Sequence, residues 1–187
     1  IELPYNIAST RKDHKVMIRE TQLLAKLNYY VAPKLDKQAF LVAGVTQWES
    51  ENLLPGESRQ FVDGTYMGKG FLNTQTTKDT LLVSMGVDQD IRTDRKRIKD
   101  FAEKTFIGGK KIETIGIEIT VRNTKAVGVE IRVEDQYPIS SNEAIEVTLI
   151  ESAGARVEAE TGLMHWDVDL KQEESKIIRF VYKVKYP

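Results

Sequence analysis

The chain has 187 residues and carries 27 Lys and Arg against 28 Asp and Glu, a formal net charge of −1 at pH 7. This balance excludes the strongly basic surface of a general nucleic-acid binder, and no run of about 18 apolar residues predicts a membrane-spanning helix. The sequence has no cysteine and only two histidines, His14 and His165, which excludes disulfides, thiol nucleophiles and histidine-built zinc centres.

Residues 1 to 107 predict an irregular antiparallel β-domain. The segment 39–48 is apolar along both faces, which indicates a strand that is covered on both sides. The dipeptide Asp63-Gly64 lies between two short strand-like runs, a sequence typical of a tight β-hairpin. Helix and strand both remain open for residues 94–106.

Residues 108 to 187 predict an immunoglobulin-like β-sandwich, so the predicted fold class of the whole chain is all-β. Apolar side chains recur at every second position, as on strands with one buried and one solvated face. Turn signals separate these strands at intervals of about ten residues, which is typical of a sandwich. The predicted inward residues are Ile117, Ile119, Val121, Val129, Ile131, Val147, Leu149, Trp166, Val168, Phe180 and Tyr182. The segment Gly-Gly-Lys-Lys at 108–111 resembles a linker and marks the predicted domain boundary.

One acidic segment has the spacing of a cation site but lacks its other requirements. A calcium-binding loop that starts at Asp88 needs Gly at position 93 and Glu at position 99, where the chain has Thr93 and Lys99. We therefore expect residues 88–94 to form a solvated, charged strand face. The basic residues from Arg92 to Lys99 alternate with aspartates, so we expect salt bridges there and no anion site.

Carboxylate pairs are numerous enough to occur by chance in a chain with 28 acidic residues. Asp167 and Asp169 would lie on one face of a strand with Cα atoms about 6.5–7 Å apart, in the range of a glycosidase pair. The other candidate pairs are Glu49 with Glu51 and Glu134 with Asp135. His165 is expected on the surface, because its neighbour Trp166 is in phase with the core positions. The sequence predicts no catalytic residue, no cofactor and no metal ligand.

Aromatic residues near the apolar segment 39–48 give the candidate interaction surface. Tyr29, Tyr30 and Trp48 border this segment, and the irregular part of the chain offers few regular strands to cover it. Contiguous exposed apolar area is typical of a binding surface. We expect these residues at the seam between the two predicted domains or at a self-association surface, with burial in an ordinary core as the alternative.

An ordered set of short motifs resembles one protein family. It includes Tyr-Val-Ala-Pro-Lys-Leu-Asp at 30–36 and Phe-Val-Asp-Gly-Thr-Tyr-Met-Gly at 61–68, and the other motifs lie at 39–43, 53–56, 82–88, 119–123, 134–138 and 184–187. Together they resemble the C-terminal domain of unknown function of the mucoidy-inhibitor A-like proteins. The resemblance implies a preceding N-terminal domain and coiled coil, often behind a bacterial signal peptide, and no catalytic residue. The chain begins at Ile1 without a signal-like segment, so we expect it to be a piece of a longer protein.

The leading hypothesis is a non-enzymatic interaction or structural domain of the bacterial cell envelope, periplasmic or extracellular. Its expected partner is a protein, either its own upstream region or a second copy. The alternative is a polysaccharide-binding or polysaccharide-active protein that uses a carboxylate pair and an aromatic platform, and an intracellular scaffold is a third option. A cleft that holds two carboxylates beside an exposed tyrosine or Trp48 would favour the polysaccharide hypothesis.

Overall fold

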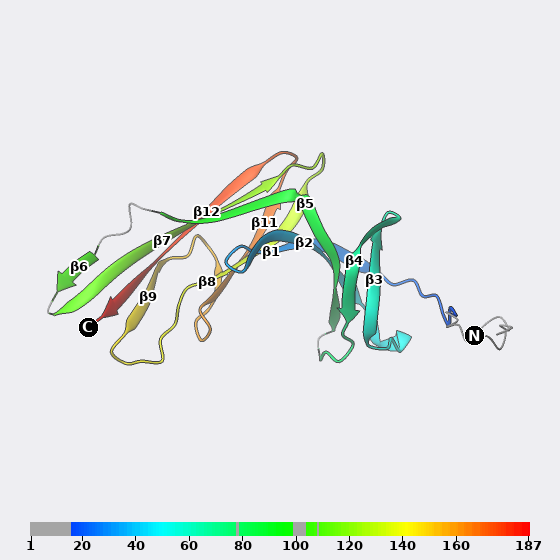
Figure 1. The fold of residues 1–187 in the computed structure, drawn as a ribbon, viewed down its shortest axis with the longest axis horizontal. Coiled ribbons are helices and arrows are strands. Elements are labelled where there is room, and N and C mark those ends of the chain that lie inside the picture. Colours follow the sequence, from blue (N-terminus) through cyan, green and yellow to red (C-terminus); the bar gives the residue numbers. More distant parts are fainter. Residues whose placement is uncertain (1–15, 78, 99–103, 108) are drawn as a thin grey trace, which may run out of the picture.

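The computed structural model describes residues 16–77, 79–98, 104–107 and 109–187 (Figure 1). These residues form twelve β-strands and one short 3-10 helix, Glu49–Glu51. The strands are β1 (Ala25–Ala32), β2 (Asp36–Thr46), β3 (Gly56–Val62), β4 (Thr65–Leu72), β5 (Thr80–Ile98), β6 (Lys104–Ile107), β7 (Lys110–Asn123), β8 (Val129–Gln136), β9 (Glu146–Glu151), β10 (Arg156–Glu158), β11 (Leu163–Leu170) and β12 (Ser175–Tyr186). The all-β prediction is confirmed, and no helix among the described residues has the length and apolarity to cross a bilayer.

Ten of the strands belong to one hydrogen-bonded sheet in the order β10-β11-β8-β1-β2-β5-β7-β12-β9, with β6 paired to β7. The β1–β8 pair is parallel, and the other pairs are antiparallel. Two of these pairs, β1 with β8 and β5 with β7, join segments from opposite sides of the predicted boundary at 107/108. The boundary therefore does not coincide with a break in the sheet. Gly108 lies outside the described residues, and Lys110, two residues later, pairs with Ile107 between β6 and β7.

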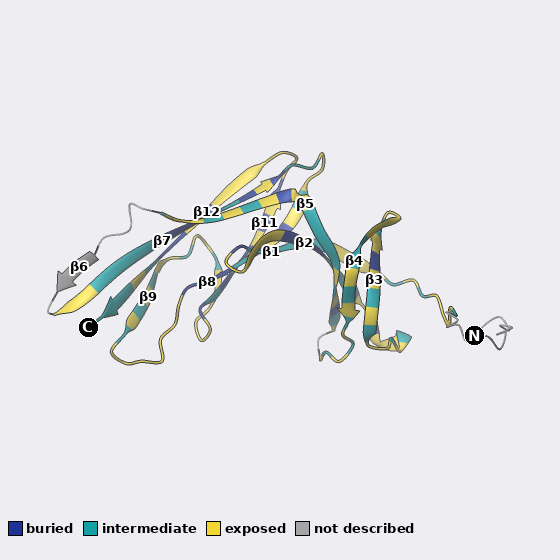
Figure 2. Ribbon diagram, in the orientation of Figure 1, coloured by how far each residue is buried: buried dark blue, intermediate teal, exposed yellow. Residues whose placement is uncertain are grey.

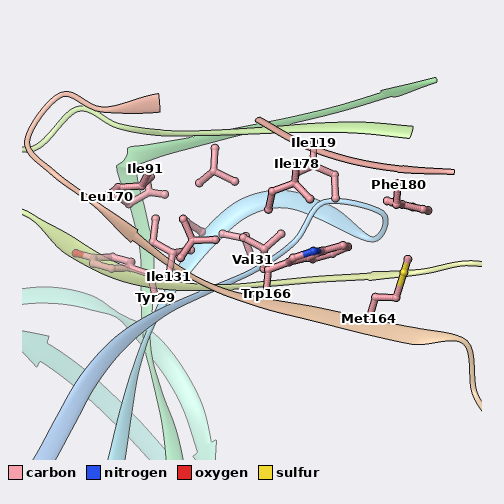
Figure 3. Close-up of a cluster of buried hydrophobic side chains, with 14 of the residues drawn as sticks. Tyr29, Val31, Ile91, Ile119, Ile131, Met164, Trp166, Leu170, Ile178 and Phe180 are labelled. Atoms are coloured by element: carbon pink, nitrogen blue, oxygen red, sulfur yellow. The ribbon is translucent and has the colours of Figure 1, made fainter. Parts of the chain in front are cut away.

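The sheet folds over so that its two ends enclose the main hydrophobic core. Figure 3 shows side chains of β7 and β12 on one side of this core and side chains of β8, β11 and β1 on the other. The rings of Trp166 and Phe180 lie 6.0 Å apart across it, and the Trp166 indole Nε1 donates to the Ser152 carbonyl oxygen at 3.0 Å. All the predicted inward residues belong to this core or pack against it, with Val129, Val147, Leu149 and Tyr182 only partly buried.

A buried ion pair adds a polar link between the two halves of the sheet. Asp135 on β8 is in phase with the core residues Ile131 and Val133, and its side chain has no solvent exposure. Arg95 on β5 donates to both carboxylate oxygens of Asp135, at 2.7 and 3.2 Å. This two-point geometry compensates the desolvation of the carboxylate and fixes how the ends of the sheet face each other.

The β3–β4 hairpin covers a second, smaller core at the other end of β2 and β5 (Figures 1 and 2). Its turn consists of Asp63 and Gly64, both with positive φ, which confirms the hairpin predicted there. Gly86 on β5 also has a positive φ of 103°, and a Cβ atom at this position would lie 2.9 Å from Cβ of Met67 on β4. The missing side chain thus lets the hairpin approach β5.

A groove on the outer face of the sheet

The outer face of the sheet carries an open hollow. The alternation that turns Ile131, Val133 and Val168 toward the core turns the side chains between them outward. The resulting groove crosses β5, β2, β1, β8 and β11 and has a volume of about 790 Å³. We call it the outer groove and define it by Lys26, Asn28, Tyr30, Val42, Gly44, Leu82, Ser84, Glu130, Arg132, Glu134, Asp167 and Asp169.

The two sides of the outer groove differ in chemistry. The β2–β5 side is mainly apolar. Its Leu82 is a large hydrophobic residue that is nevertheless 64% exposed. The β8–β11 side bears four carboxylates, those of Glu130, Glu134, Asp167 and Asp169. The groove is therefore amphipathic across its width.

Ion pairs and one tyrosine hydroxyl fix most of the charged groups in the outer groove. Lys26 binds Glu130 at 2.6 Å, and Arg132 donates to Asp167 at 2.9 Å. The hydroxyl of Tyr30 donates to Glu134 at 2.7 Å. These contacts orient the charged side chains of the groove toward one another.

The same contacts set the protonation of the groove. The hydrogen bond from Arg132 lowers the pKa of Asp167 below its ordinary value, so this carboxylate is ionised at neutral pH. The hydrogen bond to Glu130 raises the pKa of Lys26. Burial, followed by the hydrogen bond to Glu134, raises the pKa of Tyr30 to about 12. At neutral pH the groove thus contains an ionised carboxylate, a charged lysine and a neutral phenol.

The three residues of the predicted interaction surface have different surroundings. Tyr29 and Tyr30 lie on β1 where it pairs with β8, and Tyr29 points into the main core at 9% exposure while Tyr30 lines the outer groove. Trp48 is 7% exposed in the second core, and its indole Nε1 has no partner among the described residues. The apolar segment 39–48 contributes Val42 and Gly44 to the groove, so its outer face is not covered by another layer there.

One polar cluster beside Tyr29 was missed by the sequence analysis. Asp88 was expected on a solvated face, but its side chain is largely buried and accepts hydrogen bonds from the Tyr29 hydroxyl and from Lys125 Nζ, both at 2.6 Å. Lys125 also lies 5.7 Å from the centroid of the Tyr29 ring. Burial alone would raise the pKa of Asp88, yet the hydrogen bonds from Lys125 and Tyr29 lower it below its ordinary value. A sequence separation of 37 residues hides this contact from any local pattern.

The remaining candidate residues lie in several separate places. Glu134 and Asp135 point to opposite faces of β8, and Glu51 is bound by Arg19 beside the 3-10 helix. Arg95, Lys96 and Arg97 form salt bridges with Asp135, Glu118 and Glu113, as expected for this strand, whereas His14 and Lys99 lie outside the described residues. Within the described ranges, no three His, Asp or Glu side chains are grouped to hold a metal ion.

Comparisons with known proteins place the chain in a family. It is 25% identical to Protein F37C4.5 of Caenorhabditis elegans over 201 residues, a match that includes 98% of this chain and 35% of the nematode protein. The chain thus spans about a third of that relative's length. The solved folded domain of LppM from Mycobacterium tuberculosis matches 94% of this chain at 10% identity, with 96% of that domain covered and a TM-score of 0.19, too low to support a common fold. The family model for the domain of unknown function DUF4139 matches residues 1–187, and the chain belongs to this family.

Proposed function

We propose that this domain is a non-enzymatic interaction module that holds a partner in the outer groove. The observation that carries the proposal is the groove itself, an open hollow of about 790 Å³ with an apolar and a charged side. Its volume lies within the range of about 300–1,000 Å³ that is usual for ligand sites. The exposed Leu82 offers apolar contact to a partner, and the charged side chains across the groove offer it ion pairs.

The electrostatics of the groove favour binding over acid–base catalysis. A general acid at neutral pH needs a carboxyl group whose pKa is raised toward 7, whereas Arg132 lowers the pKa of Asp167. Asp167 and Asp169 share one face of β11, but Asp167 is already held by Arg132 at 2.9 Å and lies 3.7 Å from Arg156. Asp167 therefore lacks the raised pKa of a general acid, and its ion pairs make it part of a charged surface.

A polysaccharide is the second candidate ligand. Tyr30 and several carboxylates line the same open groove, which is the combination that the polysaccharide hypothesis requires. Trp48 does not contribute, because it is buried in the second core. A protein segment, from another part of the same polypeptide or from a second copy, remains the leading candidate because of the apolar side of the groove.

The motif set supports placing the whole protein among the mucoidy-inhibitor A-like proteins, and through them in the bacterial cell envelope. The nematode relative comes from an animal, whose cells have no bacterial envelope. The envelope location is therefore proposed for this protein and not for that relative. Binding in the groove does not depend on location. Fractionation of the full-length protein in its own cells tests the envelope location, and recovery only in the cytosol would contradict it.

Two variants of the 187-residue chain test the groove. Ser84 lines the groove and Ser175, at the start of β12, does not, while both serines are exposed strand residues. We expect Ser84→Trp to fill the groove and to abolish binding of a ligand found in a panel of peptides and oligosaccharides, with Ser175→Trp as the matched control. The measurement is chemical-shift perturbation in the labelled protein. Ligands that bind equally to both variants, or a panel without any binder, would contradict the proposal.

A further inference from the structure

The charges of the outer groove do not balance. Four carboxylates face two cations, Lys26 and Arg132, which leaves a formal charge of −2 on the lining. Each cation is already engaged by a carboxylate, through the Lys26–Glu130 and Arg132–Asp167 pairs. Arg156, outside the lining, lies 3.7 Å from Asp167 and offsets part of the excess, and the remaining negative charge is available to a ligand.

Asp169 is the carboxylate that the protein leaves unpaired. It lies directly opposite Glu130 in the β11–β8 register, and like charges in this position repel each other. Asp169 is exposed and forms no ion pair with any other described residue. Lys26, which binds Glu130, also interacts electrostatically with Asp169 and offsets part of this repulsion. A further cationic group from a ligand beside Asp169 would relieve the rest.

The opposite side of the groove, across from Asp169 and Glu130, presents apolar surface. Val42 and Leu82 project outward from β2 and β5, and the register pairs Gly44 with Leu82 and Val42 with Ser84. Gly44 and Ser84 are small, so this side is open to an apolar side chain. The neighbouring Asn28 contributes an amide whose Oδ1 is buried without a partner in the described part of the chain.

β1 forms the floor between these two sides. Its outward residues Lys26, Asn28 and Tyr30 are spaced two apart, and the strand rises about 3.3 Å per residue, so they extend over about 13 Å. An extended peptide above β1 would direct successive side chains to opposite sides of the groove. Every second side chain would then meet the carboxylates, and the others would meet Val42 and Leu82.

We propose that the outer groove binds an extended peptide of five or six residues in which basic side chains alternate with apolar ones. This inference rests on the proposed function and specifies the chemistry of the partner. Alternation is the essential feature, because it matches one acidic and one apolar side across a single floor strand. A polyamine offers charge without the apolar side chains, and a neutral oligosaccharide offers neither.

Calorimetry on the 187-residue chain tests this inference at low salt. The probes are acetyl-KLKLKL-amide, its block isomer acetyl-KKKLLL-amide, acetyl-ELELEL-amide, spermidine and a neutral hexasaccharide. We expect the alternating basic peptide to bind at least about tenfold more tightly than each other probe, a difference of about 1.4 kcal/mol. We expect its affinity to fall as salt increases.

Charge variants with the same net charge identify the site. Glu130→Gln with Asp169→Asn removes two groove carboxylates, and Glu143→Gln with Glu160→Gln removes two exposed carboxylates outside the groove. We expect the groove variant to weaken binding of the alternating basic peptide about tenfold or more and the control variant to leave it unchanged. Ser84→Trp should abolish this binding.

The outcomes separate the two proposals. Equal weakening by both charge variants, or equal affinity for the block isomer or spermidine, would overturn the peptide inference. Binding of the hexasaccharide or the acidic peptide that is lost in Ser84→Trp would also overturn it, while leaving the groove as a binding site. If no probe bound in the groove, both proposals would fail.

Discussion

β8 and β11 present two faces that behave in opposite ways. On the inner face, Val133 and Trp166 pack into the core, with exposures of 0% and 6%. On the outer face of the same strands, Arg132 and Asp167 form a half-exposed ion pair in the groove. Since the side-chain period of a strand is two, a single register assigns core packing to one face and the proposed binding groove to the other. Substitutions on the two faces should therefore have separable effects.

The largest effect is expected on the inner face. Trp166→Ala removes a buried ring that packs on Phe180 and donates to the Ser152 carbonyl. We expect the free energy of unfolding to fall by about 3–5 kcal/mol, measured by urea denaturation. The control is Asp167→Asn, one residue further along β11, which should cost less than about 1 kcal/mol. Comparable losses in the two variants would contradict the division between the faces.

The second effect tests whether the inner face tolerates charge only as a pair. Arg95→Met removes the charged partner of Asp135 and leaves the Gln136 backbone N–H as a donor, while the Asp135 side chain has no solvent exposure. We expect a loss of about 3 kcal/mol in the free energy of unfolding. Asp135→Asn should cost less, because the remaining Arg95 is partly exposed and can be hydrated. The reverse order in chemical denaturation would show that the carboxylate reaches water in the folded state.

Much of the inner face follows from the sequence, because alternation reports directly on burial. Ile119, Ile131 and Phe180 were predicted as core residues and are almost fully buried. Likewise, Asp63-Gly64 forms its hairpin from local backbone preference. Local patterns thus predict strands and their inward faces well in this chain.

The outer groove was not predictable from the sequence, because its members meet only through long-range pairing. The parallel β1–β8 pair brings Tyr30 beside Arg132, about a hundred residues later in the chain. The alternation that identifies Asp167 and Asp169 as outward residues does not reveal which strand lies next to β11. Tyr30 was singled out as an aromatic residue near an apolar segment and Glu134 as one of a possible carboxylate pair, but their contact with each other was not predicted.

The third effect concerns the polar cluster beside β1, where the core meets solvent. Lys125→Met removes the hydrogen bond to Asp88 and the cation near the Tyr29 ring. We expect the free energy of unfolding to fall by about 1–2 kcal/mol, because Asp88 keeps the Tyr29 hydroxyl as a donor. This loss lies between those expected on the inner and outer faces. Lys176→Met, an exposed lysine on β12, provides the control in the same urea titration. A loss no greater than that of the control would show that the Tyr29 hydroxyl and the Asp90 backbone N–H together satisfy Asp88.

The smallest effect is expected on the outer face and depends on pH. Arg132 lowers the pKa of Asp167, so the pair contributes stability above the ordinary Asp pKa of about 3.9, and this contribution is lost as the pH falls through the lowered value. Because the pair is half exposed, Asp167→Asn should cost only about 0.2–1 kcal/mol at pH 7 and nothing once the wild-type carboxylate is protonated. Asp169→Asn removes a carboxylate that repels Glu130 and should not destabilise the protein at pH 7. Urea unfolding of both variants at pH 7 and at successively lower pH, until the difference from the wild type no longer changes, makes this comparison. If the cost of Asp167→Asn persisted in acid, Asp167 would have a packing role. The electrostatic difference between Asp167 and Asp169, on which the proposed ligand preference of the groove depends, would then disappear.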